Sequence, residues 1–231
     1  MFKIKLEAKD ILYEDNHVIV VLKPAGIPSQ ADKSGDIDIL SMVKEYIKEK
    51  YNKPGNVYVG LVHRLDRMTS GIMVFAKTSK GASRLSENIR NGDFKKEYLA
   101  CVEGKLELNL TATLKDYIVK DEKNNLSKIV KSSHKDAKEA LLEYTVIGHT
   151  VYKDKTYSYV KIKLYTGRHH QIRVQFSNIG HPLYGDVKYG GKPGDLALFA
   201  YKLSTYHPTK DEMLEFVHYP EKQGIWKELE I

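Results

Sequence analysis

The sequence predicts an α+β protein with a mixed, mainly antiparallel sheet and a few covering helices. Short apolar runs of strand length recur along the whole chain, whereas few segments show the spacing of an amphipathic helix. Strands and helices also fail to alternate regularly, as they would in a doubly wound parallel sheet. A length of 231 residues suits one packed domain or two tightly joined halves, and we expect residues 1–231 to form a single catalytic domain.

The first part of the chain predicts a sheet with one covering helix. Residues 18–22 form an apolar run that stops at a proline, which predicts a buried strand followed by a turn. Apolar residues at helical spacing over 39–47, with Lys and Glu between them, predict an amphipathic helix. Residues 57–62 and 71–77 are strand-like, so the polar stretch 63–70 between them is expected to be a loop.

The middle of the chain combines a short helix, a strand and a basic segment. Apolar residues within 82–89 predict a helix that ends at Gly92. Alternation over 94–100 predicts a strand. Residues 105–138 hold eight lysines against five acids, and their Asp- and Asn-rich centre predicts a hairpin on the surface.

The last part of the chain returns to core strands. Residues 140–148 and 156–167 predict two strands, the second with Val160, Ile162 and Leu164 on one face. The segment that follows them, GRHHQIRVQFSN, is expected to be helical. A loop rich in Gly and Pro follows, and then two closing strands over 196–203 and 213–217.

Composition excludes several classes of protein. The chain is 42% hydrophobic and 29% charged, as in ordinary globular proteins, and its net charge of +7 favours a polyanionic partner such as nucleic acid. It contains no run long enough to span a membrane, no signal peptide and only one cysteine, Cys101. No glycine-rich nucleotide cradle and no hydrolase triad motif occurs. We therefore expect a cytoplasmic protein that binds no membrane and no cofactor. Because no repeated apolar seam occurs in the sequence, we also expect a monomer.

Four of only six arginines fall in two short windows, HRLDRMTSG (63–71) and GRHHQIR (167–173). In the first window, Asp66 lies between Arg64 and Arg67, and nearby cations favour the ionised form of a carboxylate, which can act as a nucleophile. A structural salt bridge on a solvated loop is the alternative interpretation.

The second window suits the recognition of phosphate or carboxylate groups, because it combines arginines with the start of a helix. A metal site is disfavoured, since His169 and His170 are adjacent and no carboxylate accompanies them. Between the windows, Tyr98 lies on an alternating strand, where packing in the sheet is the alternative to a functional role.

Taken together, four segments in this order resemble the RluA-type pseudouridine synthases, which isomerise uridine in structured RNA: YEDNHVIVVLKPAGIPSQ, HRLDRMTSG, KKEYLA and GRHHQIRVQFSNIGHPLYGDVKYG. The resemblance implies a pseudouridine-synthase-like domain with a central cleft that acts on ribosomal or transfer RNA without a cofactor. It implies that Asp66 is the catalytic aspartate, Tyr98 the active-site tyrosine, and Arg173 the arginine that pairs with the aspartate. The remaining substrate contacts expected are His63, Arg64, Thr69, Ser70, Gly71, Arg168, His170 and Gln171.

The chain departs from many members of this family in two respects. It begins close to the catalytic core rather than with an RNA-binding S4-type domain, so we expect RNA recognition to rest on the core surface and the lysine-rich segment 105–138. Gln175 stands where many members have histidine. Two alternative functions are a non-catalytic RNA-binding or ribosome-assembly module on the same fold, and a nucleoside glycosidase that releases free uracil.

Overall fold

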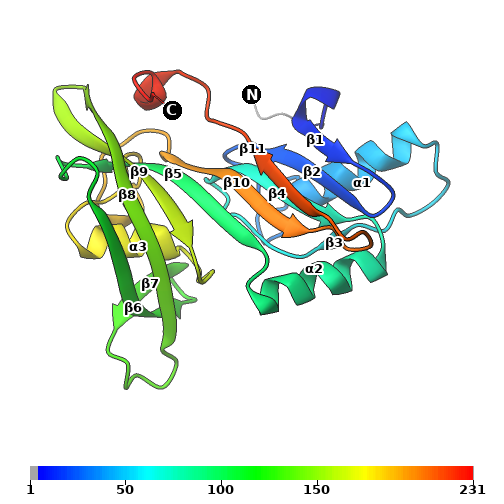
Figure 1. The fold of residues 1–231 in the computed structure, drawn as a ribbon, viewed down its shortest axis with the longest axis horizontal. Coiled ribbons are helices and arrows are strands. Elements are labelled where there is room, and N and C mark those ends of the chain that lie inside the picture. The colour runs from blue at the N-terminus through cyan, green and yellow to red at the C-terminus, as the bar shows by residue number, and fades with distance from the viewer. Residues whose placement is uncertain (1–4, 231) are drawn as a thin grey trace. The chain divides into compact units, whose positions relative to one another are not determined.

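The computed structural model describes residues 5–230, and the chain divides into two compact units (Figure 1). The first unit contains the residues up to 95 together with 200–219, and the second contains 96–199 together with the segment from 220 onward. Eleven strands and three α-helices occur in the described residues, and most strand pairs are antiparallel. The predicted α+β class is thus confirmed, while a single domain over residues 1–231 stays a prediction.

The first unit is a sheet covered by helices. Its core joins β2 and β4 to α2 through buried side chains such as Val20, Val74 and Leu85. Side chains of Asp38 and Thr78 accept hydrogen bonds from backbone N–H groups at the starts of the two helices, as helix caps do. The elements are β1 (Ile11–Glu14), β2 (Val18–Lys23), α1 (Ile39–Lys50), β3 (Gly60–Leu61), β4 (Ser70–Ala76), α2 (Ser79–Asn91), β10 (Leu198–Tyr206) and β11 (Met213–Val217).

The second unit is a five-stranded antiparallel sheet with one helix against it. Phe176 of the helix packs on Tyr144 of the sheet, with ring centroids 5.0 Å apart. The lysine-rich segment contains the predicted hairpin, whose two strands lie at the edge of this sheet. In sheet order the strands are β5 (Lys95–Glu103), β9 (Lys155–Leu164), β8 (Lys138–Tyr152), β6 (Thr111–Asp121) and β7 (Leu126–Val130), and the helix is α3 (Gln171–Asn178).

The structure differs from the sequence predictions at three places. Helix α3 begins at Gln171 rather than at residue 167, because His170 adopts a left-handed backbone conformation with φ of 50°. Residues 57–62 provide only the short strand β3, and β1 was not predicted.

None of the helices in the described residues is long and apolar enough to cross a membrane.

Gly71 provides a test of the packing between β4 and β10. Its φ is 122°, and a Cβ atom there would lie 2.3 Å from the carbonyl oxygen of Ala200. We expect Gly71→Ala to lower the free energy of unfolding by about 3 kcal/mol or more, because backbone strain and overpacking add. Urea unfolding measures this loss.

Gly92→Ala is the matched control for this experiment. Gly92 also has a positive φ, 81°, but nothing lies within 4 Å of the position that its Cβ would take. Only the conformational cost of about 1 kcal/mol is then expected. Equal losses in the two variants would contradict the close approach at Gly71.

Candidate functional site

Asp66 lies at the tip of an irregular loop that leads into β4. The backbone N–H of Thr69 donates to the carbonyl oxygen of Asp66 at 3.0 Å, which closes a tight turn behind the carboxylate. Asp66 itself is half-buried. The turn therefore holds the carboxylate at a defined position without removing it from solvent.

A buried lysine that the sequence analysis did not select supports this loop. Lys23 is 1% exposed, and its Nζ donates to the carbonyl oxygens of Pro24 at 2.8 Å, Ile27 at 2.7 Å and Arg67 at 3.0 Å. A neutral amine has only two hydrogens, so three acceptors select the ammonium form. The charged side chain thus joins the turn after β2 to the loop that carries Asp66.

The electrostatic environment links Lys23 to Asp66. Burial lowers the pKa of Lys23 to about 7, whereas the charge of Asp66 acts to raise it and the charge of Arg67 to lower it. This interaction is reciprocal, because a cation that is favoured by a carboxylate favours the ionised carboxylate in turn. Asp66 therefore stands in the field of a buried cation.

Two further side chains fix the backbone just before Asp66. The hydroxyl of Ser29 donates to the carbonyl oxygen of Leu65 at 2.7 Å and accepts from its N–H at 3.0 Å. His63 is buried, and its Nε2 accepts from the N–H of Val74 at 3.0 Å. The predicted substrate residue His63 thus has an internal role in the loop, and a contact between His63 and substrate stays a prediction.

The arginines beside Asp66 take different roles from each other. Arg67 forms an ion pair with Asp36 and donates to the hydroxyl of Ser34 at 3.2 Å, so it orders the preceding loop. Arg64 is exposed and makes no hydrogen bond or ion pair within residues 5–230. The expected stabilisation of Asp66 by its two sequence neighbours stays a prediction, and Lys23 is a further cation near this carboxylate.

The other predicted residues of this window lie around the turn. Thr69 is 2% exposed, and its Oγ1 has no hydrogen-bond partner in the described part of the chain. Ser70 is half-buried at the start of β4, where Gly71 meets the backbone of Ala200. The hydroxyl of Thr69 is thus a polar group close to Asp66 in sequence that the fold leaves unsatisfied.

The second unit carries Tyr98 and Arg173. Tyr98 is 5% exposed and lies on β5 opposite Ile162 of β9. Arg173 projects from α3, and its Nε and Nη2 each donate to a carboxylate oxygen of Asp186 at 2.7 Å. Arg173 is 6% exposed and Asp186 1% exposed, so this is a buried bidentate pair. The predicted pairing of Arg173 with Asp66 stays a prediction, and Asp186 is a partner that the sequence analysis missed.

The histidines before α3 are neutral. Burial is the main cause that lowers the pKa of His169 to about 4, and the charges of Lys120 and Arg173 contribute. Burial and then Arg173 hold the pKa of His170 far below its usual value. The Nδ1 atom of His170 lies 2.8 Å from the hydroxyl of Tyr189, whose ring stacks below the guanidinium of Arg173 at 5.1 Å.

Two predicted substrate residues at this end of the sheet support the loop before α3. The Oε1 atom of Gln171 accepts from the hydroxyl of Thr166 at 2.8 Å and from the N–H of Arg168 at 3.0 Å. The Nε of the exposed Arg168 donates to the carbonyl oxygen of Glu139 at 2.8 Å. These bonds shape the loop, and direct contacts of Gln171 and Arg168 with substrate stay predictions.

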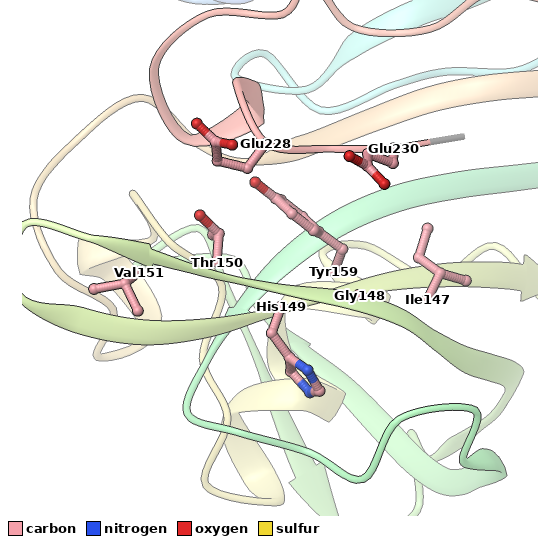
Figure 2. Close-up of a pocket in the computed structure, with 8 residues that line it drawn as sticks. All are labelled: Ile147, Gly148, His149, Thr150, Val151, Tyr159, Glu228 and Glu230. Atoms are coloured by element: carbon pink, nitrogen blue, oxygen red, sulfur yellow. The ribbon is translucent and has the colours of Figure 1, made fainter.

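A surface hollow elsewhere in the second unit contains none of these residues (Figure 2). It is lined by part of β8, by Tyr159, and by the carboxylates of Glu228 and Glu230. Two carboxylates make it unsuited to a phosphate backbone. No cluster of three His, Cys, Asp or Glu side chains that could hold a metal ion occurs in the residues that the structure describes.

Comparison with known proteins gives one consistent result. A family model described as RNA pseudouridylate synthase matches residues 17–178. An uncharacterized RNA pseudouridine synthase of Aquifex aeolicus (strain VF5) is 35% identical over 225 residues, which cover 90% of this chain and 68% of that protein. The ribosomal large subunit pseudouridine synthase D of Yersinia pestis is 32% identical over 228 residues, with 90% and 66% covered. The chain thus spans about two thirds of the length of these relatives.

A solved structure agrees with the sequence relatives. The human protein named RNA pseudouridylate synthase domain containing 1 superposes with a TM-score of 0.75 at 25% identity. The match covers 93% of this chain and 84% of the human one. The similarity therefore extends over both units of the fold.

The buried pair of Arg173 and Asp186 generates a stability prediction. Asp186→Ala leaves the buried guanidinium without this carboxylate, and we expect the free energy of unfolding to fall by about 3–5 kcal/mol. Denaturant unfolding measures the change. Glu143→Ala is the control, because the pair of Glu143 with Lys163 is solvent-exposed and contributes at most about 1 kcal/mol. Similar losses of unfolding free energy in both variants would show that the buried pair of Arg173 and Asp186 stabilises the fold no more than an exposed pair does.

Proposed function

Because this chain belongs to the RNA pseudouridylate synthase family of isomerases, in agreement with the RluA-type resemblance of its sequence, we propose that it converts specific uridines of ribosomal or transfer RNA to pseudouridine. It acts as a cytoplasmic monomer, with Asp66 as its catalytic carboxylate. The observation that carries this proposal is the setting of Asp66. It is half-buried, it lies on a loop held by buried side chains, and the neighbouring ammonium of Lys23 favours its ionised form.

The reaction requires a charged group and a proton acceptor. The bond between N1 of uracil and C1′ of ribose breaks, a bond between C5 and C1′ forms, the proton on C5 leaves, and N1 gains a proton. Atoms and electrons balance without an oxidant or reductant. Asp66 acts by attack on the sugar, by attack on the base, or by removal of a ribose proton, and each of these uses requires the ionised carboxylate that the environment favours.

Tyr98 and Arg173 complete the proposed catalytic set. The phenol of Tyr98 is a candidate acceptor for the C5 proton, and its ring also offers a surface against which uracil packs. Arg173 is held by both carboxylate oxygens of Asp186, so its guanidinium is presented in one fixed orientation. A fork fixed in this way supplies directional charge that a flexible lysine does not.

The target nucleotide has to leave its stack before it reaches these groups, at a cost of a few kcal/mol. Arg64 is the candidate that fills the vacated place, because it is exposed and has no partner within residues 5–230. Contacts to the RNA backbone offset the remaining cost. Thr69, with its unsatisfied buried hydroxyl, is a candidate for a further hydrogen bond to substrate.

The hairpin of β6 and β7 is the proposed RNA-binding arm, since residues 105–138 carry a net charge of +3 from eight lysines and five acids. Some of its lysines are neutralised within the fold: Lys120 pairs with Glu122 and Lys128 with Asp121. Five others are exposed and form no ion pair in the described residues, among them Lys123, Lys131 and Lys135. Their charges are therefore available to phosphates.

Substitution of Asp66 tests the catalytic assignment. We expect Asp66→Asn to abolish pseudouridine formation, because an amide is neither a nucleophile nor a base, while RNA binding is retained. The measurement is site-resolved pseudouridine mapping of RNA from cells that lack the gene, complemented with wild type or with the variant. Arg173→Lys serves as a second variant and should lose most activity, because it keeps the charge but not the fork.

The outcomes of the mapping separate the competing functions. Loss of one or a few pseudouridines that only wild type restores supports the enzyme and identifies its target. Full modification by a folded Asp66→Asn protein would refute the catalytic role of Asp66. RNA binding without any modification by purified wild-type protein on unmodified transcripts would favour the non-catalytic binding module.

The binding arm is tested by neutralising three of its free lysines. In the triple variant Lys123→Gln, Lys131→Gln and Lys135→Gln, the slope of log affinity against log salt should become shallower by about 2, at about 0.7 for each contact to single-stranded RNA. Equilibrium titration at several salt concentrations measures it. A control triple variant removes the same charge from α1 and α2 by Lys44→Gln, Lys48→Gln and Lys80→Gln. Equal effects of both triple variants would reject a specific role for the arm.

A further inference from the structure

Lys96 and Tyr98 share one face of the second unit's sheet. They lie two residues apart on β5, and side chains alternate between faces along a strand. Across the sheet, Tyr98 is in register with Ile162 and then Tyr144, while Lys96 is in register with Leu164 and then Leu142. Because Phe176 of α3 packs on Tyr144, this is the face that α3 covers. The strand thus presents a lysine beside the active-site tyrosine.

The surroundings of Lys96 remove water without supplying a counter-charge. Burial is the cause that lowers its pKa, and no acidic group opposes that effect. Its Nζ lies 3.3 Å from the position that a Cβ atom of Gly167 would take, so the ammonium sits against exposed backbone of the loop before α3. Within the described residues Lys96 forms no hydrogen bond or ion pair.

The nearest acid in sequence does not neutralise this lysine. Glu97 points to the opposite face of β5, where it is in register with Lys163, and Lys163 in turn pairs with Glu143 at 2.9 Å. Around the loop before α3, the charges of Lys120, Arg173 and Lys188 act to lower the pKa of His169 and the charge of Glu122 acts to raise it. Arg173 is paired with Asp186 and Lys120 with Glu122, so these acids have their own cationic partners and Lys96 keeps an uncompensated charge.

A desolvated cation without a counter-charge destabilises the free protein. An anion that arrives with the substrate would remove this cost. Uracil and ribose are neutral, so the only full negative charges that an RNA strand brings are its phosphodiester oxygens. The exposed Gly167 has no side chain to block their approach to the ammonium.

We propose that Lys96 binds a phosphodiester oxygen of the RNA strand at the target nucleotide, and so positions that nucleotide against Tyr98. The inference rests on the proposed function, because it assumes that the nucleotide at Tyr98 belongs to an RNA strand. It assigns to Lys96 a substrate-positioning role that the loop and helix residues do not supply. It also accounts for a half-buried lysine that makes no bond within the protein.

The test combines RNA binding with thermal stability. The variants are Lys96→Met, which keeps the length of the side chain, and Lys96→Arg, which keeps the charge. The control is Lys163→Met, which removes an exposed lysine from the opposite face. The probe is an RNA hairpin with a loop of uridines only, titrated at several salt concentrations, and pseudouridine formation is followed in parallel on unmodified ribosomal and transfer RNA transcripts.

A phosphate contact predicts a pattern that a structural role does not. We expect Lys96→Met to bind the hairpin roughly tenfold more weakly, with a salt slope shallower by about 0.7, and to melt at the same or a higher temperature than wild type. Lys96→Arg should restore most of the affinity, and Lys163→Met should bind like wild type. A lower melting temperature of Lys96→Met together with no rescue by arginine would assign Lys96 to the fold and overturn the proposal.

The remaining outcomes separate this inference from the proposed function. If wild type forms pseudouridine and Lys96→Met binds RNA with unchanged affinity and salt slope, the inference fails and the proposed function stands. If wild type forms no pseudouridine on any transcript, the proposed function fails. In that case the binding titrations still decide whether Lys96 contacts a phosphate.

Discussion

The loop that carries Asp66 depends on the bonds from one buried ammonium to three carbonyl oxygens. Between β3 and β4 the chain has no regular ladder of hydrogen bonds to fix it, so Lys23 supplies the connection to the turn after β2. Burying an ammonium costs several kcal/mol, and the carbonyl dipoles and the charge of Asp66 offset part of this cost, since the pKa of Lys23 is still lowered to about 7. The cation that fixes the loop thus also favours the ionised carboxylate of Asp66.

Three buried or half-buried cations in this protein differ in the groups that surround their charge. Lys23 is surrounded by carbonyl oxygens, and Arg173 is paired with the carboxylate of Asp186. Lys96 has neither kind of partner within the described residues. The charges of Lys23 and Arg173 have their partners in the free protein, and each of these cations therefore has a structural role in its own unit. Lys96 lacks such partners in the described part of the chain, which is the physical reason for assigning it to a ligand rather than to the fold.

The sequence predicted most elements of the fold, because apolar runs report burial directly: β2, β4 and β11 occur where strands were expected. Partners of charged side chains were not predictable in the same way. Arg67 pairs with Asp36 and Arg173 with Asp186, and these choices depend on how loops fold back in three dimensions. The start of α3 was misplaced because His170 adopts a left-handed backbone conformation with φ of 50°, which the spacing of apolar residues does not reveal.

Most arginines of the two sequence windows form directional bonds within the protein. Three arginines of the two sequence windows make bonds within the protein: Arg67 to Asp36, Arg168 to a backbone carbonyl, and Arg173 to Asp186. A planar fork with several fixed donors suits such directional contacts, whereas a lysine suits a mobile surface charge that attracts phosphates. Arg64 is the member of the four without a partner in residues 5–230. Since the fold does not use its fork, the guanidinium of Arg64 is open to a ligand, in line with its proposed role of replacing the flipped nucleotide.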